Sequence, residues 1–369
     1  MIIGCPREIK TLENRVGIIP ATVKSLVKTG AKVLVEKDAG RGSNISDDAY
    51  VAAGGQIISH REEIWQKADI IVKVKEPLKE EFSFFRERQV IYTFLHLAAE
   101  PELTRALLDK KITAIAYETI EENGQLPLLK PMSEVAGRMS VQVGALCLEN
   151  QYGGKGILLG GVPGVLKARV VIIGAGVVGK NAAKMALGMG AKVTVLDVNP
   201  TRLEEIDDLF LGQVETMFSS AHSIESQVLR ADCVIGAVLV AGAKAPRLVS
   251  KELVSAMEPG SVVVDVAVDQ GGCIETVHRT THDKPTYILS GIVHYGVANM
   301  PGAVACTSTY ALSHATSPYL LAIVRDGVYR ALKESPALQK GLNTLDGYVT
   351  HREVANALNL AYRAPEELL

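Results

Sequence analysis

The sequence lacks the features of a membrane, secreted or nucleic-acid-binding protein. None of its apolar runs reaches the roughly 18 residues that a bilayer-spanning helix needs. Its first residues, MIIGCPREIK, contain neither the apolar stretch nor the small-residue cleavage site of a secretory signal. Lysine and arginine together number 39 against 41 acidic residues, and no long basic patch is visible. We therefore expect no membrane partner and no nucleic-acid partner.

Cysteine is also scarce, and its pattern argues against two kinds of site. The five cysteines are scattered and are never spaced as Cys-x-x-Cys (Cys5, Cys147, Cys233, Cys273 and Cys306). This argues against a disulfide framework and a thiolate zinc site, and it favours a reducing, cytoplasmic location. The histidines suggest no set of metal ligands either. We therefore predict no catalytic metal.

What the sequence does have is an alternation of strand-like and helix-like segments. Over residues 1–130, apolar segments such as KVLVEK, DIIVKV, QVIYTFLHL and ITAIAY alternate with amphipathic ones that begin at a proline or a capping serine. A long helix with Ser133 as its N-cap is expected next, and a second strand–helix series starts at Val170. The segment after about residue 305 is predicted to be helical. The whole pattern predicts an α/β protein with two doubly wound parallel-sheet (Rossmann-like) domains and helical linkers.

Three glycines follow the first strand of the second series in the pattern Gly-x-Gly-x-x-Gly, at Gly174, Gly176 and Gly179. Such glycines permit a tight turn, a close approach of the backbone to a pyrophosphate, and close packing of helix against strand. Asp197 ends the next strand 23 residues after Gly174, where a carboxylate binds ribose hydroxyls and repels a 2′-phosphate. We therefore predict NAD as the cofactor, although the nearby Arg202 leaves NADP open. A tight turn without any nucleotide is the structural alternative.

Ionisable residues that follow apolar strands are candidates for substrate chemistry, because ligands of open α/β sheets bind at the carboxyl ends of strands. His96 follows VIYTFL, and its ordinary pKa near 6.5 suits a general acid or base. Asp269 follows SVVVDVAV and precedes Gln270 and two glycines. Lys73 and Lys75 are two positions apart, so on a strand their side chains would point to the same face. Arg15 lies after the first strand, where its guanidinium could bind a carboxylate. Each residue also has a purely structural interpretation. His96 could be a core histidine and Asp269 a turn residue. The two lysines could lie at a solvated strand end, and Arg15 could be a surface arginine.

Short segments along nearly the whole chain resemble the alanine dehydrogenase family. They are, in order, ENRVGIIP, KVKEP, TFLHLAAEPEL, AIAYET, LPLLKPMSEVAGRMS, GGVPGV, VVIIGAGVVG, GAKAPRLV, VVVDVAVDQGG, YGVANMPGAV and TSTYAL. The related NAD-binding domain of proton-translocating transhydrogenase shares part of this pattern. The resemblance implies NAD-dependent oxidative deamination of L-alanine to pyruvate and ammonia, together with the reverse reductive amination.

The resemblance also implies roles for residues of this chain. Arg15 and Lys75 correspond to substrate-binding residues, and His96 and Asp269 to residues that transfer protons. Besides the three glycines of the loop, Gly174, Gly176 and Gly179, cofactor contacts are implied at Ser133, Val178, Asp197, Arg202, Ser219, Val238, Leu239, Val266, Ala267, Val268, Asp269, Val297, Ala298, Asn299 and Met300. Whether His278 or Arg279 provides a further cofactor contact is left open.

The resemblance further implies that the substrate-binding, catalytic domain is discontinuous. It would comprise residues 1–130 plus 305–369, with an NAD-binding Rossmann domain at residues 131–304 and a cleft between the two. The protein would be a homo-oligomer, and such enzymes usually assemble as hexamers. Two departures from other members stand out: LLAIVRDG lacks an acid–histidine pair that can bind a metal, and Ala305-Cys306 replaces a common proline and basic residue.

Other functions stay open at this point. An NAD-dependent 2-hydroxy acid dehydrogenase also places a nucleotide domain between parts of a catalytic domain. Its histidine usually follows the cofactor domain, however, whereas His96 precedes it here. The alternatives from another class are the NAD(H)-binding module of a transhydrogenase and a redox sensor that binds NADH without chemistry.

Overall fold

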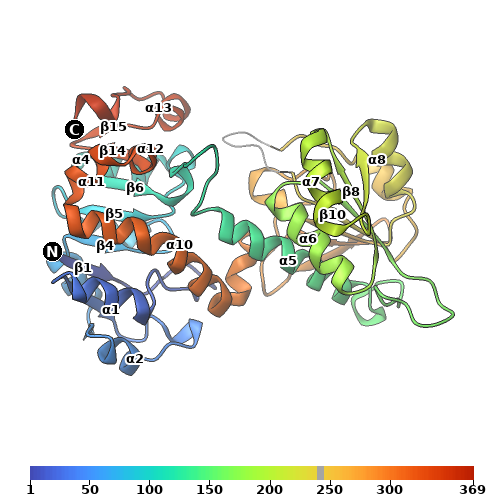
Figure 1. The fold of residues 1–369 in the computed structure, drawn as a ribbon, viewed down its shortest axis with the longest axis horizontal. Coiled ribbons are helices and arrows are strands. Elements are labelled where there is room, and N and C mark those ends of the chain that lie inside the picture. Colours follow the sequence, from blue (N-terminus) through green and yellow to red (C-terminus); the bar gives the residue numbers. More distant parts are fainter. Residues whose placement is uncertain (239–244) are drawn as a thin grey trace. The chain divides into compact units, whose positions relative to one another are not determined.

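Two compact units make up the chain (Figure 1). The computed structural model describes residues 1–238 and 245–369. Unit 1 comprises Met1–Met132 and Val304–Leu369, so both ends of the chain belong to it, and unit 2 comprises Ser133–Ala303. Over the described residues, no helix is both long enough and apolar enough to cross a membrane.

Unit 1 is built on an eight-stranded sheet in the order β15-β14-β6-β5-β4-β1-β2-β3. Its parallel strands are β1 Ile2–Cys5, β2 Lys32–Glu36, β3 Gln56–Ile58, β4 Ile70–Val72, β5 Val90–Thr93 and β6 Thr113–Ala116. The helices are α1 Pro20–Lys28, α2 Asp47–Ala52, α3 Arg61–Lys67, α4 Pro101–Asp109, α10 Ala305–Asp326, α11 Val328–Glu334, α12 Pro336–Gly341 and α13 Arg352–Leu358. The order 3-2-1-4-5-6 of the parallel strands is that of a doubly wound fold.

Local sequence signals set several helix boundaries in unit 1. Pro20 occupies the first turn of α1, where a missing N–H leaves no hydrogen bond unmade. The side chain of Ser46 caps α2 by accepting a hydrogen bond from the N–H of Ala49. The C-terminal segment completes the unit, because α10 packs beside α1 (Figure 1).

The expectation that the chain is helical after residue 305 is wrong for one segment. β14 Leu342–Leu345 and β15 Tyr348–Val349 form a hairpin, and β14 pairs antiparallel with β6. Asp346 and Gly347 between them have φ angles of 48° and 86°, as a two-residue type I′ turn requires. An Asp-Gly pair between apolar segments is a strong hairpin signal, so the sequence contained the information.

Unit 2 repeats the doubly wound arrangement on a seven-stranded sheet in the order β12-β13-β11-β10-β7-β8-β9. The strands are β7 Arg169–Ile173, β8 Lys192–Asp197, β9 Glu215–Phe218, β10 Cys233–Gly236, β11 Val262–Asp265, β12 Thr286–Leu289 and β13 Ile292–Tyr295. The helices are α5 Lys130–Cys147, which belongs to unit 2 from Ser133 onward, α6 Val177–Gly188, α7 Pro200–Phe210, α8 Ala221–Val228 and α9 Lys251–Ser255. β12 pairs antiparallel with β13, and the remaining neighbours are parallel.

The long helix α5 begins earlier than the sequence predicts. Ser133 is expected to be its N-cap, but the helix starts at Lys130 and already contains Ser133. Pro131 is compatible with this start, because proline needs no N–H partner in the first turn of a helix. The capping prediction for Ser133 is therefore wrong.

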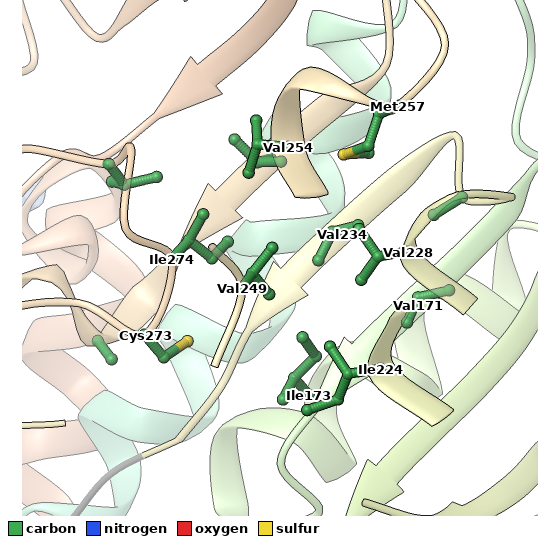
Figure 2. Close-up of a cluster of buried hydrophobic side chains, with 14 of the residues drawn as sticks. Val171, Ile173, Ile224, Val228, Val234, Val249, Val254, Met257, Cys273 and Ile274 are labelled. Carbon is green, nitrogen blue, oxygen red and sulfur yellow. The ribbon is translucent and has the colours of Figure 1, made fainter. Parts of the chain in front are cut away.

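Buried apolar side chains fill one side of the unit-2 sheet (Figure 2). Val171 and Val234 from the strands pack with Ile224 and Val228 of α8 and with Val254 of α9. Nearly continuous buried runs along these strands are typical of parallel sheets covered on both faces. This core fixes the strand ends that carry most of the predicted cofactor residues.

Candidate functional site

The residues predicted for substrate binding and catalysis in unit 1 follow three neighbouring strands. Arg15 lies after β1, Lys75 after β4 and His96 after β5. β1 and β4 are adjacent, but the chain leads from β1 outward to β2 and from β4 outward to β5, so the strand order reverses between them. In doubly wound sheets, ligands bind outside the carboxyl ends of the strands at such a point. All three side chains therefore belong to the edge of the unit where a ligand is expected.

Glu13 orients the guanidinium of Arg15. Nε of Arg15 donates to Oε1 of Glu13 at 2.6 Å, and Nη2 pairs with Oε2 of the same carboxylate. Nη1 lies 3.1 Å from the sulfur of Met132. Both members of the pair are buried, and a two-pronged ion pair fixes the plane of the guanidinium. A cavity of about 520 Å³ lies beside them, lined in part by Arg15, Glu13 and Lys10.

Lys73 and Lys75 occupy different environments, so the prediction that they share a strand face is wrong. β4 ends at Val72, before either lysine. Lys73 is fully buried, and its Nζ lies 3.1 Å from Glu8 and 3.2 Å from Glu81. Burial lowers the pKa of the Lys73 ammonium, but the two carboxylates outweigh burial and raise that pKa overall. Lys73 is therefore a charged structural residue.

Lys75 differs from Lys73 in lacking a fixed counter-ion. Within residues 1–238 and 245–369, its ammonium makes no ion pair, while its backbone N–H donates to Glu8. Burial lowers the pKa of Lys75, and the positive charge of Arg15 lowers it further. The carboxylate of the adjacent Glu76 pairs with Lys10. The neighbouring charges of Lys75 and Arg15 favour the binding of an anion.

His96 has an unusual backbone conformation and a carboxylate beside it. Its φ and ψ are 52° and 35°, in the left-handed region that is uncommon for non-glycine residues. Glu118, which follows β6, accepts hydrogen bonds from the N–H of His96 at 2.6 Å and of Leu95 at 3.1 Å. Oε1 of Glu118 lies 3.8 Å from Nδ1 of His96. The imidazole is about half exposed, so it can exchange protons with a ligand.

In unit 2, the glycine loop joins β7 to α6. Gly174 has a φ of 110°, and a Cβ there would lie 2.7 Å from the carbonyl oxygen of Ala237. A Cβ on Gly179 would lie 1.7 Å from the carbonyl oxygen of Gly174, because α6 packs directly against the turn. A Cβ on Gly176, in contrast, would meet no atom within 4 Å. Gly176 precedes the first turn of α6, whose N–H groups favour an anion.

Asp197 lies beside this loop at the end of β8. Its Oδ2 accepts a hydrogen bond from the N–H of Ala175 at 2.7 Å, and its Oδ1 accepts one from Asn199 at 2.8 Å. Nη1 of Arg202 is 3.8 Å from Oδ2, and the N–H of Ser219 donates to the carbonyl oxygen of Asp197. An ionised carboxylate has about four acceptor positions, so capacity for ribose hydroxyls is left. The loop and this carboxylate together fit a dinucleotide.

The start of α6 also approaches α5. A Cβ on Gly137 of α5 would lie 2.2 Å from the carbonyl oxygen of Val178, so the two helices are in close contact there. Ser133 stands four residues before Gly137 and so lies on the same face of α5. Val178 therefore lies where α6 meets α5, and Ser133 lies on the face of α5 that carries Gly137.

The other predicted cofactor residues also follow strands of the unit-2 sheet. Val238 follows β10, residues 266–269 follow β11 and residues 297–300 follow β13. Because these strands are parallel, their carboxyl ends share one edge with the glycine loop. Leu239 lies outside the described residues.

Two groups of unit 2 hold the side chain of Asp269. Oδ1 lies 3.2 Å from Nη2 of Arg279, and Oδ2 accepts a hydrogen bond from the N–H of Asn299 at 3.2 Å. His278 instead stacks on Tyr287, with 4.0 Å between the ring centroids. Arg279 rather than His278 thus contacts the predicted proton-transfer residue.

His278 and His282 are four residues apart, which is a spacing that metal sites on helices use. The prediction of no catalytic metal did not take this pair into account. The segment between them is not helical here. Nε2 of His282 lies 3.2 Å from the carbonyl oxygen of Asn299. Among the residues that the structure describes, no group of three or more His, Cys, Asp and Glu side chains is arranged to hold a metal ion.

Comparison with known proteins places the chain in a family. A model described as "Alanine dehydrogenase/PNT, N-terminal domain" matches residues 4–136, and the corresponding "C-terminal domain" matches residues 140–352. The chain belongs to the alanine dehydrogenase/PNT family. A protein named alanine dehydrogenase from Methanococcus maripaludis is 59% identical over 371 residues, with 100% of both chains covered. One of the same name from Bacillus subtilis is 55% identical over 370 residues, covering 100% of this chain and 98% of that one.

Solved structures of the family share the fold. A structure called L-alanine dehydrogenase has a TM-score of 0.95 at 50% identity and covers 97% of this chain and 99% of that one. A transhydrogenase from Sinorhizobium meliloti has a TM-score of 0.83 at 27% identity, covering 95% and 100%. The family resemblance and the α/β, Rossmann-like fold that the sequence predicts are thus confirmed.

Two carboxylates beside the predicted residues were not predicted from the sequence. Glu13 stands two positions before Arg15, inside the segment ENRVGIIP. Glu118 follows the strand-like segment AIAY, which is the same signal that singled out His96. A search for ionisable residues after every predicted strand, rather than after selected ones, identifies Glu118.

Proposed function

We propose that this protein catalyses the NAD-dependent oxidative deamination of L-alanine to pyruvate and ammonia, and the reverse reductive amination. The observation that supports it best is the grouping of Arg15, Lys75 and His96 after neighbouring strands, in a chain 59% identical to a protein named alanine dehydrogenase. Alanine carries a carboxylate, which needs cations, and an ammonium, which must lose a proton before the α-carbon can be oxidised. The chain offers both kinds of group.

Arg15 and Lys75 bind the carboxylate of the substrate in this proposal. Glu13 fixes the plane of the Arg15 guanidinium before a substrate arrives, so less side-chain freedom is lost on binding. Lys75 has a pKa lowered by burial and by Arg15, and an added carboxylate favours its charged form. Binding at two points orients the α-hydrogen, which supplies much of the effective concentration that catalysis needs.

His96 moves the protons at the reacting carbon. It accepts a proton from the water that attacks the oxidised α-carbon, and it returns a proton when ammonia leaves. Its imidazole is half exposed and is positioned after β5 in the same unit as Arg15 and Lys75. The family resemblance assigns proton transfer to Asp269 as well, which Arg279 and the N–H of Asn299 hold within unit 2.

The dinucleotide, when bound, accepts the hydride from the α-carbon of alanine. The open space beside Gly176 and the N–H groups of α6 would hold its pyrophosphate, and Asp197 its ribose hydroxyls. A carboxylate at this position disfavours a 2′-phosphate, so we propose NAD rather than NADP. Titration should give a dissociation constant at least about tenfold lower for NADH than for NADPH. Equal affinities would contradict this choice and would assign Arg202 a phosphate-binding role.

The transhydrogenase module and the 2-hydroxy acid dehydrogenase remain the competing functions. The first needs no substrate-binding cations, whereas Arg15 and Lys75 stand together at a strand-reversal point of unit 1. The second oxidises an alcohol and therefore needs no step that releases ammonia. Absorbance at the NADH band, followed with NAD and either L-alanine, lactate, serine or glycine at alkaline pH, separates these functions. Turnover with lactate but not with L-alanine would overturn the proposal.

A histidine variant tests the proposed mechanism. His96→Ala should lower kcat by about 10²–10⁴-fold, which is the usual contribution of positioned acid–base catalysis, while NADH binds as in the wild type. His60→Ala is the matched control, because His60 is an exposed histidine of the same unit. Near-normal turnover of the His96 variant would remove His96 from the mechanism.

The proposal extends to location and assembly. All five cysteines are free thiols, four of them buried, as expected for a cytoplasmic enzyme. The family resemblance favours a homohexamer. Light scattering of the purified protein tests this, and a monomer would contradict it.

A further inference from the structure

We propose that Glu8 is a positioning residue for Lys75, because its carboxylate holds the peptide that carries this lysine and so fixes where the ammonium meets a substrate carboxylate. This inference rests on the role of Lys75 in the proposed function. Glu8 follows β1, whereas Lys75 follows the neighbouring strand β4, 67 residues further along the chain. The contact between them therefore depends on the fold and not on local sequence.

The backbone around Lys75 has left the sheet, so its N–H groups need partners other than a neighbouring strand. β4 pairs with β1 as far as Ile71 and ends at Val72. Beyond that point, Oε1 of Glu8 accepts the N–H of Val74 at 2.6 Å and the N–H of Lys75 at 3.2 Å. Leaving buried donors of this kind without an acceptor is costly. A side chain that follows β1 thus replaces β1 itself as the acceptor.

The strand β5, on the other side of β4, holds the rest of this segment. The N–H of Lys73 donates to the carbonyl oxygen of Tyr92 at 3.2 Å, and Oγ1 of Thr93 donates to the carbonyl oxygen of Lys75 at 3.0 Å. With Glu8, the backbone of Lys75 is therefore bonded at both its N–H and its carbonyl group. The position of the Lys75 ammonium then depends only on the rotation of its own side chain.

A different lysine maintains the charge of Glu8. Oε2 of Glu8 lies 3.1 Å from Nζ of Lys73, and both side chains are buried. Burial raises the pKa of Glu8, and the ammonium of Lys73 opposes that rise. The two oxygens thus serve two groups of donors, since Oε1 accepts the peptide N–H groups while Oε2 faces the ammonium. A glutamine has a single oxygen, so it cannot satisfy both groups.

Glu8 also borders the cavity beside Arg15, where a carboxylate could contact a ligand directly. Both of its oxygens already face donors of unit 1, however. Its charge would also repel the substrate carboxylate that Arg15 is proposed to bind. A direct role predicts that Glu8 matters even without Lys75, whereas the positioning role predicts an effect only through Lys75. The experiment must separate these two roles.

The first test compares Glu8→Gln with Glu81→Gln. Glu81 is the matched control, because it is also buried and pairs with the same Lys73, but its second oxygen accepts the N–H of Leu78. Glu8→Gln should raise KM for alanine about tenfold or more with a smaller fall in kcat, since a lysine that binds the substrate carboxylate already acts in the ground state. Glu81→Gln should keep both constants within about threefold, and NADH should bind to both variants as to the wild type.

Two results of this comparison overturn the inference. One is a wild-type KM for folded Glu8→Gln, with folding checked by circular dichroism. The other is an equal rise in KM for Glu81→Gln, which would trace the effect to Lys73 and not to the peptide of Lys75.

A double-variant cycle decides whether Glu8 acts through Lys75. Lys75→Ala should by itself raise KM for alanine. Adding Glu8→Gln should then raise KM by less than about a further twofold, because the group that Glu8 positions is gone. A larger further rise overturns the inference and favours direct contact between Glu8 and the ligand. If Lys75→Ala itself keeps the wild-type KM, the proposed function loses its substrate-binding lysine instead, so the two failures are distinguishable.

A second variant covers the case in which Glu8→Gln does not fold. Glu8→Asp keeps the negative charge near Lys73 but withdraws the carboxylate by one methylene from the peptide of Lys75. KM for alanine should again rise about tenfold or more, and it should rise no further in the Lys75→Ala background. A wild-type KM for this folded variant overturns the inference.

Discussion

One methyl group, added at three positions of the same segment, tests where the dinucleotide binds. The variants are Gly176→Ala, Gly179→Ala and Gly188→Ala, all at or within α6. A Cβ at Gly179 would lie 1.7 Å from the carbonyl oxygen of Gly174, whereas real Cβ contacts are essentially never shorter than 3.0 Å. The added Cβ is attached directly to the backbone, and the oxygen belongs to the backbone of the same tight turn, so no side-chain rotation can relieve the contact. Cβ atoms at Gly176 and Gly188 would meet nothing within 4 Å.

The expected magnitudes differ for each position. Gly179→Ala overpacks the turn, which should lower the free energy of unfolding by about 1–3 kcal/mol or more. If the distorted turn loses a similar amount of binding free energy, NADH affinity falls roughly 10- to 100-fold. Gly176 has a φ of −69° and a ψ of −165°, which any residue can adopt, so its alanine variant should fold normally. Its methyl would nevertheless occupy the space proposed for the pyrophosphate, and NADH affinity should fall about tenfold or more. Gly188→Ala should bind NADH normally and gain about 0.5–1 kcal/mol of stability.

Two measurements separate these outcomes. Isothermal titration gives the NADH dissociation constant, and thermal unfolding gives the stability of the transition that contains unit 2. The decisive variant is Gly176→Ala, because it should lose binding without losing stability. If it binds NADH as tightly as the wild type, the pyrophosphate does not lie at the glycine loop. An unchanged melting temperature for Gly179→Ala would refute the packing argument.

Further predictions concern buried charges and cofactor choice. Lys73→Met leaves Glu8 and Glu81 buried without a counter-ion and should destabilise unit 1 by about 3–5 kcal/mol in denaturant unfolding, and Glu81→Gln added to it should recover part of the loss. A wild-type midpoint for Lys73→Met would show that the carboxylates become protonated without cost. Burial lowers the pKa of His294, which is fully buried between Ile292 and Thr276. Its stabilising contribution is therefore complete above the unfolded value near pH 6.5 and is lost as pH falls through the lower folded pKa. The slope of stability against pH below 6.5 should be smaller in His294→Gln, and an identical slope contradicts this. Asp197→Ser should raise NADPH affinity relative to NADH, and an unchanged ratio of dissociation constants would exclude Asp197 from cofactor choice.

The features that sequence predicted well depend on short-range constraints. The glycine loop is predictable because the constraint on it is local. Gly179 packs against the carbonyl oxygen of Gly174, only five residues earlier, and leaves no room for a Cβ. The strand ends that carry His96 and Asp197 are predictable because parallel strands give nearly continuous apolar runs. The Asp346-Gly347 hairpin has an equally local signal, because both residues of the pair readily adopt the positive φ angles of its turn.

The features that sequence did not predict depend on partners brought together by the fold. Lys73 and Lys75 look alike in the segment IVKVKEP, and only the packing of Glu8 and Glu81 around Lys73 separates their roles. The identity of a buried ion's partner is set by tertiary structure, since any of the nearby carboxylates could serve. The same holds for Glu118, whose relation to His96 no spacing reveals.

The charge pattern at the carboxyl edge of the unit-1 sheet would favour an anionic ligand there. Lys73 is balanced by Glu8 and Glu81, Lys10 pairs with Glu76, and Glu13 occupies one side of the Arg15 guanidinium. Lys75 has no such counter-ion among the described residues, and its lowered pKa shows that its charge is costly in this environment. A carboxylate beside Lys75 removes part of that cost, whereas a neutral ligand does not. In the proposed complex, the same carboxylate would also contact the guanidinium of Arg15, whose plane Glu13 already fixes, so affinity and orientation would have one physical origin.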